Sequence, residues 1–171
     1  MTTIVRASES DSLLLAEIGK ISFIESHGNS ASEAVIDEYV RRSYTTDAFK
    51  TELANPGNNY DIIYHGEQAA GFSKIVLNAS HSNIPIQNLT KLDRLYLLKE
   101  FCGKKLGAQL LRFNVKLSEQ NNQSGMWLFV WKENHGAVRF YQKAGFEIIG
   151  SYDFHLTEIH SNPNHQMLLK Y

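Results

Sequence analysis

Residues 92–111 read LDRLYLLKEFCGKKLGAQLL, and the stretch changes character within these twenty residues. It begins with an apolar run, 92–98, that predicts a strand, and it continues through a turn-like patch, 99–104, that contains Gly103. From Lys105 onward apolar residues recur at spacings of three and four, which is the period of a helix. The stretch therefore predicts a strand that passes into a helix through a short loop containing Gly and Lys.

This order of elements has two interpretations. The first N–H groups of a helix lack intrahelical partners and carry partial positive charge, so a phosphate can bind there. An ordinary strand-to-helix connection has the same appearance, with Gly103 and Gly107 used for turning and close packing. The stretch alone does not decide between them, because such a motif needs supporting context.

Length and composition bound the protein class. A chain of 171 residues is expected to form a single domain over 1–171, and a net charge of −1 argues against nucleic acid as a partner. Cys102 is the only cysteine, which excludes an internal disulfide and argues against a zinc cluster. The N-terminus lacks the pattern of a secretory signal, and no apolar run has the length of a membrane span. We expect a cytoplasmic protein with no membrane partner.

The segments before residue 92 predict one strand, three helices and a hairpin. Strand 2–7 is followed by a helix from Ser10 or Asp11 to Ile21, a polar loop at 26–32, and helices over 32–42 and 47–54. Two strands, 60–64 and 68–77, are joined by a turn that contains Gly66.

The segments after residue 111 complete the pattern. The predicted helix 105–120 is followed by the apolar run MWLFVW at 126–131, which is typical of a strand covered on both faces. A helix over 134–143 ends at Gly145, and strands 146–154 and 167–171 flank a polar segment at 158–165. The order β-α-α-α-β-β-β-α-β-α-β-β predicts a mixed α/β (α+β) fold, antiparallel in its first half, with helices on the faces of the sheet.

Two further groups of residues have the chemistry of a site. Asn134 and Tyr141 lie two turns apart on one helix face, where a phenol could return a proton to a departing group; an N-cap and a core tyrosine would equally explain them. An acidic and aromatic group near the N-terminus would suit a cationic amine, although such residues also form ordinary solvated helix faces. Its members are Phe23, Glu25, His27, Asp37, Glu38, Tyr39 and Tyr44. No histidine pair has metal-ligand spacing, so we expect no metal.

Taken together, these residues resemble the GNAT superfamily of N-acetyltransferases over nearly the whole chain. RLYLLKEFCGKKLGAQLL is similar to the family's strand, pyrophosphate loop and helix, and WLFVW followed by NHGAVRFYQKAGF is similar to its next strand and helix. Within the superfamily the chain most resembles bacterial PaiA-type polyamine (spermidine/spermine) acetyltransferases. That likeness rests on residues 23–26 (FIES), 52–56 (ELANP), 92–96 (LDRLY) and the pattern Val130-Trp131-x-x-Asn134.

The resemblance implies a mostly antiparallel sheet with one splayed parallel pair, and it implies a set of binding residues for acetyl-CoA. Backbone groups of the predicted strand would bind the acetyl and pantetheine part, the loop and helix start would hold the pyrophosphate, Asn134 would contact the pantetheine or its phosphate end, and Tyr141 would be the general acid near the sulfur. The strand residues are Leu95, Tyr96 and Leu97, and the loop residues are Gly103, Lys104, Lys105, Leu106, Gly107 and Ala108.

The sequence departs from the family pattern at several positions. In the loop motif Gln/Arg-x-x-Gly-x-Gly/Ala, Cys102 replaces Gln/Arg and Lys105 replaces the first Gly, which puts CoA affinity in question. The strand position that some relatives use as a general base is Phe129, so Glu25 or Asp93 acting through water, or solvent, would have to remove the proton from the amine. The PaiA-type Gln-Thr-Asp segment is Asn164-His165-Gln166 here, which lacks the acid that would favour a polycation.

The resulting expectation is an acetyl-CoA-dependent N-acetyltransferase that acts on a small primary amine such as a polyamine, with a homodimer suggested by exposed C-terminal strands. One alternative is acetylation of a peptide N-terminus, a lysine or another small amine. A second is a non-catalytic acyl-CoA-binding or regulatory module, and a third is a structural protein that binds no CoA.

Overall fold

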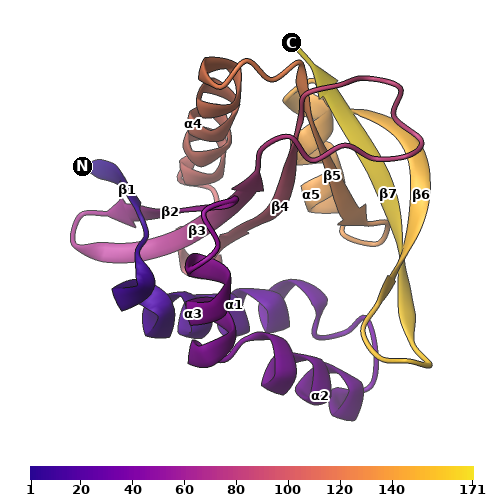
Figure 1. Ribbon diagram of the computed structural model, residues 1–171. Helices are drawn as coiled ribbons and strands as arrows, with labels where there is room; N and C mark the ends of the chain where they lie inside the picture. Colours follow the sequence, from indigo (N-terminus) through magenta and orange to yellow (C-terminus); the bar gives the residue numbers. More distant parts are fainter.

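The computed structural model describes all 171 residues, and its centre is a seven-stranded sheet with the order β1-β2-β3-β4-β5-β7-β6. The elements follow one another along the chain in the predicted order (Figure 1). The strands are β1 (Thr2–Arg6), β2 (Asn58–His65), β3 (Gln68–Val76), β4 (Leu89–Leu97), β5 (Gly125–Trp131), β6 (Glu147–His155) and β7 (Ser161–Lys170). The α-helices are α1 (Ser12–His27), α2 (Glu33–Ser43), α3 (Thr46–Leu53), α4 (Leu106–Gln120) and α5 (His135–Lys143).

The sheet is mixed and mostly antiparallel, as expected. Strands β1 to β4 form an antiparallel meander, and β5, β7 and β6 form a second antiparallel group. The two groups meet at β4 and β5, which are parallel. Helices α1, α2 and α3 gather at one side of the sheet, away from α4 and α5 (Figure 1).

The parallel pair is short, and it determines where the site lies. Pairing of β4 with β5 runs from Leu89 opposite Gly125 to Lys91 opposite Trp127 and then stops, so the rest of the two strands diverge. Just beyond this point β4 has a bulge: Ile75 of β3 pairs with Leu92, but Lys74 pairs with Arg94, which leaves Asp93 as the extra residue. A bulge bends its strand and increases its twist, which directs β4 away from β5.

The two largest apolar clusters lie on the two faces of the sheet. One contains Leu15, Phe23, Phe49, Tyr60 and Phe72 and lies between the sheet and α1 to α3. The other packs α4 and α5 against β4, β5 and β7, and Tyr141 belongs to it. None of the helices combines the length and the apolar character that crossing a membrane requires.

The structure corrects two boundaries and determines one pair of strand neighbours that the sequence left open. Helix α1 continues to His27, so the loop predicted at 26–32 is shorter. Most of the polar segment predicted at 158–165 is strand, because β7 begins at Ser161; its buried Asn162, Asn164 and Gln166 concealed the strand by supplying amides where apolar residues are usual. Finally, β5 and β6 are not neighbours, because β7 lies between them.

The edge strand β6 agrees with the exposure that suggested a dimer. Ile148, Ile149 and Tyr152 on this strand are between 38% and 44% exposed. Nothing in a single chain tests the association, so the dimer remains a prediction.

Candidate active site

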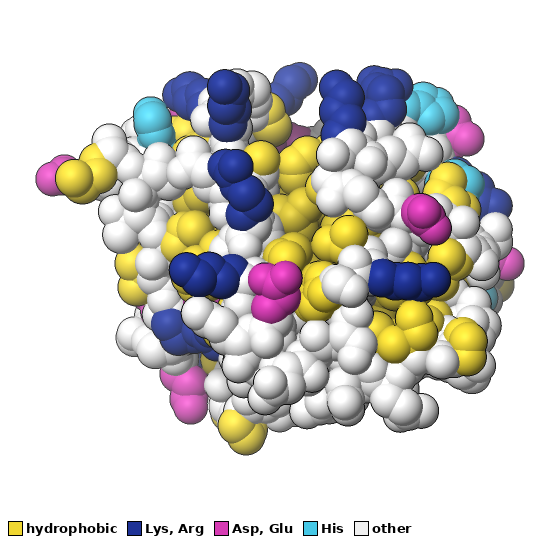
Figure 2. Space-filling model, turned by 90° about the horizontal axis from the view of Figure 1, so that it is seen from above, with side chains coloured by type: hydrophobic (Ala, Val, Ile, Leu, Met, Phe, Trp, Pro, Cys, Tyr) yellow, Lys and Arg dark blue, Asp and Glu magenta, His cyan; other side chains and the backbone are white.

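A cavity of about 310 Å³ opens where β4 and β5 diverge. Its walls come from β4 and β5, from the C-terminal part of α1, from α5 and from β7. In the view from above, hydrophobic side chains occupy the middle of the face and Lys and Arg side chains gather along one edge (Figure 2). Exposed basic residues on α4, on α5 and in the loop between β4 and α4 give this part of the molecule a positive charge: Lys104, Lys105, Arg112, Lys116, Arg139 and Lys143.

The loop before α4 has the geometry of an anion site. Lys105 is the N-cap of α4 and adopts a left-handed backbone, with φ 63°, that favours glycine. Its side chain makes no cap hydrogen bond, and the first turn contains no acidic residue. The N–H groups at this helix start are therefore open to an anion. Gly107 also packs closely, since a Cβ there would lie 3.2 Å from Leu97 Cδ1.

The expected cofactor-binding residues of β4 lie along the diverging edge. Beyond Lys91 the edge of β4 that faces β5 has no strand partner, so backbone groups of Leu95, Tyr96 and Leu97 border the cavity. The hydroxyl groups of Tyr96 and Tyr44 are 3.1 Å apart, which anchors the Tyr96 side chain on the α1 side of the sheet. A free strand edge can bind an extended amide-containing ligand through main-chain hydrogen bonds.

Asn134 and Tyr141 both line the cavity from α5. Asn134 is an N-cap, because its side-chain oxygen accepts a hydrogen bond of 3.1 Å from the Ala137 N–H. Tyr141 is 8% exposed, and no protein group forms a hydrogen bond with its hydroxyl. Burial raises the pKa of Tyr141, with a smaller contribution from Tyr96, so the phenol stays protonated at neutral pH. Tyr141 therefore brings a protonated hydroxyl group to the lining of the cavity.

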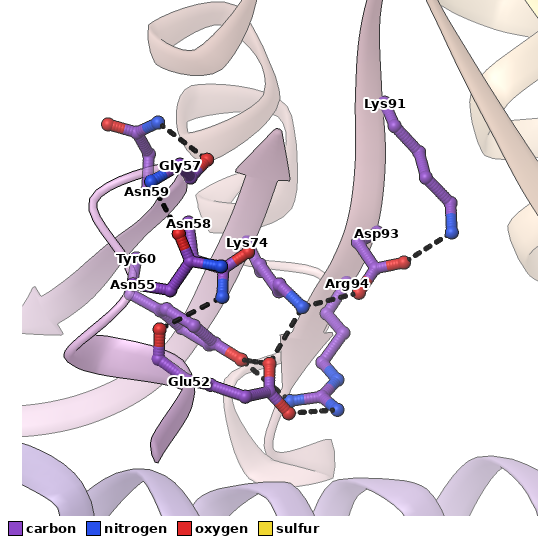
Figure 3. Close-up of polar contacts among 10 residues, drawn as sticks. All are labelled: Glu52, Asn55, Gly57, Asn58, Asn59, Tyr60, Lys74, Lys91, Asp93 and Arg94. Atoms are coloured by element: carbon purple, nitrogen blue, oxygen red, sulfur yellow. Dashed lines mark hydrogen bonds and ion pairs between the residues drawn. The ribbon is translucent and has the colours of Figure 1, made fainter. Parts of the chain in front are cut away.

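Asp93 belongs to a network of charges that joins α3, β3 and β4 (Figure 3). Its carboxylate lies 3.0 Å from Lys74 Nζ and 2.7 Å from Lys91 Nζ. Lys74 also lies 2.7 Å from Glu52, which accepts a 3.0 Å hydrogen bond from Arg94. Burial by itself would raise the pKa of Asp93, but the two lysines and Arg94 lower it to about 2. Asp93 is therefore a carboxylate at any working pH and a poor proton acceptor.

The other expected carboxylate, Glu25, is exposed and does not line the cavity. It accepts a 2.9 Å hydrogen bond from the Lys99 N–H and so fastens α1 to the loop after β4. Asp37 and Glu38 are exposed on α2. They therefore agree with the second interpretation of the acidic and aromatic group, which is an ordinary solvated helix face. Of that group, Phe23 and His27 reach the cavity.

His27 is stacked on Phe23 with 4.8 Å between ring centroids. Burial lowers its pKa to about 4, so the ring is neutral at pH 7. The sequence did not identify the other cavity-lining polar residues as site residues: Ser22, Lys91, Arg94, Asn162 and Asn164. The last two alternate with Gln166 at a spacing of two, which is the period of a strand and the signal that could have revealed them.

Comparison with known proteins agrees with this geometry. Residues 24–146 match the Acetyltransferase (GNAT) family, which is more than half of the chain. The chain belongs to the GNAT family. It is accordingly an N-acetyltransferase that depends on acetyl-CoA. The open helix start, the basic residues around it and the free edge of β4 fit that cosubstrate.

Several relatives of this GNAT enzyme are described as acetyltransferases. It is 28% identical over 138 residues to the spermidine N(1)-acetyltransferase of Thermoplasma acidophilum, covering 78% of this chain and 81% of that protein. It is 27% identical to an uncharacterized N-acetyltransferase of Lactobacillus delbrueckii subsp. lactis, covering 83% and 82%. In fold it resembles the PaiA N-acetyltransferase of Thermoplasma acidophilum solved with coenzyme A, with a TM-score of 0.80, 23% identity and coverage of 100% and 99%.

The charge network predicts a specific loss of stability in acid. Because the pKa of Asp93 is lowered in the folded state, its ion pairs stabilise the protein above the ordinary Asp pKa of about 3.9, and this stabilisation is lost as pH falls toward about 2. We expect Asp93→Asn to cost about 2 kcal/mol at pH 7 and to flatten the fall in the free energy of unfolding between about pH 4 and pH 2. Urea titrations at pH 7 and between about pH 4 and pH 2 measure the loss of stability and its dependence on pH. Glu38→Gln, on an exposed face, is the control; if it changes the curve as much as Asp93→Asn, the assignment is wrong.

Lys105 allows a test of the anion site. If its charge faces the pyrophosphate, Lys105→Glu should weaken CoA binding about tenfold or more in a calorimetric titration. Lys105→Gly keeps the left-handed backbone and removes the charge, so its affinity should lie between those of the wild type and Lys105→Glu. Lys20→Glu makes the same charge change on an exposed part of α1 and should leave binding unaltered. Equal affinity of Lys105→Glu and wild type would rule out this contact.

Proposed function

We propose that this enzyme acetylates a primary amine by direct attack, and that a polyamine such as spermidine is the first acceptor to test. The observation that carries the proposal is the placement of the Tyr141 hydroxyl and the free edge of β4 on one cavity, next to the open start of α4. Relatives named spermidine or spermine N(1)-acetyltransferases support the choice of a polyamine. Asp93 is paired with Lys74 and Lys91, so the proposal does not rely on its charge to bind the acceptor.

The proposed binding set follows the walls of the cavity. Backbone groups of Leu95, Tyr96 and Leu97 hold the acetyl and pantetheine part, and the segment from Gly103 to Ala108 holds the pyrophosphate. Asn134 uses its side-chain oxygen to cap α5, so its amide NH₂ is the group that remains for the pantetheine. Acetyl-CoA, when bound, supplies the acetyl group as an activated thioester.

Proton transfers complete the proposed reaction. An ammonium group has no lone pair, so the acceptor loses one proton before it attacks. The amine nitrogen then forms a bond with the acetyl carbon as the carbon–sulfur bond breaks. The second nitrogen proton passes to water, and Tyr141 donates its phenol proton to the departing sulfur and regains one from solvent. Of the two expected carboxylates Asp93 is the one that lines the cavity, but its lowered pKa makes it a poor base, so we assign the first proton loss to solvent.

A panel of amines tests the acceptor. Release of free thiol from acetyl-CoA is followed with spermidine, a peptide with a free N-terminus, an Nα-blocked lysine and 2-phenylethylamine, with CoA binding measured in parallel. The proposal expects spermidine to give the highest kcat/KM. A higher value for the peptide or the lysine would favour the alternative acceptors, and binding of CoA without turnover of any amine would contradict amine acetylation.

The role of Tyr141 has its own test. Tyr141→Phe removes one hydroxyl that has no protein partner, so the fold and CoA affinity should be unchanged while kcat falls by about 10- to 1000-fold, the range of general acid catalysis. Tyr152→Phe removes an equivalent hydroxyl from β6, outside the cavity, and should leave kcat unaltered. Equal turnover of Tyr141→Phe and wild type would remove Tyr141 from the mechanism.

A further inference from the structure

Asn164 lines the cavity and carries a buried polar atom that has no partner in the protein. It lies on β7, with Trp131 of β5 opposite it on one side and Tyr152 of β6 on the other. The residue is 7% exposed and lines the cavity. Its side-chain oxygen is buried and has no hydrogen-bond partner in the protein.

Gln166 Nε2 on β7 is also buried and unpaired but does not line the cavity, whereas Asn162 lines the cavity and is paired. The side chain of Asn162, which also lines the cavity, donates a 2.8 Å hydrogen bond to Ser30 Oγ and lies 3.2 Å from His160 Nε2. Buried amides in native proteins are almost always paired in this way, and an unpaired one is costly. Asn162 thus serves the fold, while the oxygen of Asn164 has no structural partner.

The chemistry of the cavity indicates what the partner is. An amide oxygen accepts hydrogen bonds, so its partner is a donor such as an amine N–H. The carboxylate on this cavity, Asp93, is already held between two lysines. Ser22 of α1 also lines this cavity, and its hydroxyl is buried and unpaired. Unpaired groups on two walls indicate a polar ligand between them.

We infer that the side-chain oxygen of Asn164 binds the acceptor amine, accepting a hydrogen bond from its nitrogen. This inference rests on the proposed function, and it adds a binding residue and a chemical reason for the choice of acceptor. A neutral amide oxygen can accept an N–H from the uncharged amine, which is the form that attacks, and it does not hold the ammonium form as a carboxylate would. The site therefore selects an amine by one hydrogen bond and shape rather than by a ring of negative charge.

Kinetics of Asn164→Leu test the inference. With acetyl-CoA and each of three probe amines, spermidine, 2-phenylethylamine and trialanine, the KM for the best amine should rise about tenfold, as expected for one lost hydrogen bond. The KM for acetyl-CoA should not change, and the melting temperature should not fall, because no protein hydrogen bond is removed. Asn162→Leu is the matched control: it breaks contacts with Ser30 and His160 and should lower the melting temperature.

Asn164→Asp provides a second measurement should Asn164→Leu fail to fold. It keeps the size of the side chain and adds a charge, so it should shift the preference of the enzyme toward spermidine over 2-phenylethylamine. Unchanged KM values in Asn164→Leu, or an unchanged preference in Asn164→Asp, would overturn the inference while leaving the proposed function intact. A wild-type enzyme that binds CoA and acetylates none of the three amines would overturn the proposed function, and the inference with it.

Discussion

The early separation of β4 from β5 is the constraint on which the rest of the structure depends. Parallel strands pair through evenly spaced hydrogen bonds, and here that pairing ends at Lys91 and Trp127. The bulge at Asp93 follows at once and turns β4 aside. Backbone groups that would otherwise complete the sheet are left facing a cavity, and a ligand with amide groups can take the place of the missing strand contacts.

The same separation divides the chemistry between the two faces of the sheet. On the side of α4 and α5, exposed lysines and arginines surround an open helix start and suit phosphate. On the side of α1, aromatic rings and amides surround the inner end of the cavity, including Phe23, Trp131 and Asn164. Tyr141 of α5 lines this cavity as well.

The sequence predicted the order of all the elements and the strand, loop and helix that define the cofactor side, because hydrophobic periodicity there is strong. It predicted only the C-terminal part of β7, since Asn162, Asn164 and Gln166 line or adjoin a cavity and replace the apolar residues that mark a strand. The left-handed backbone of Lys105 could not be predicted, because a lysine occupies a position that favours glycine. The sequence identified Asp93 as a candidate base. The lowering of its pKa depends on Lys74, which comes close to Asp93 only because β3 pairs with β4.

The charge network around Glu52 has a consequence for how the protein can change over evolutionary time. Glu52, Tyr60, Lys74, Asp93 and Arg94 come from α3 and three strands, and each charge is balanced by another in the group. Replacing one member leaves a largely buried charge without its partner, whereas compensating replacements restore the balance. Among related chains these positions should therefore be inherited as a unit, and their covariation would record how β4 is held in place rather than which amine the enzyme prefers.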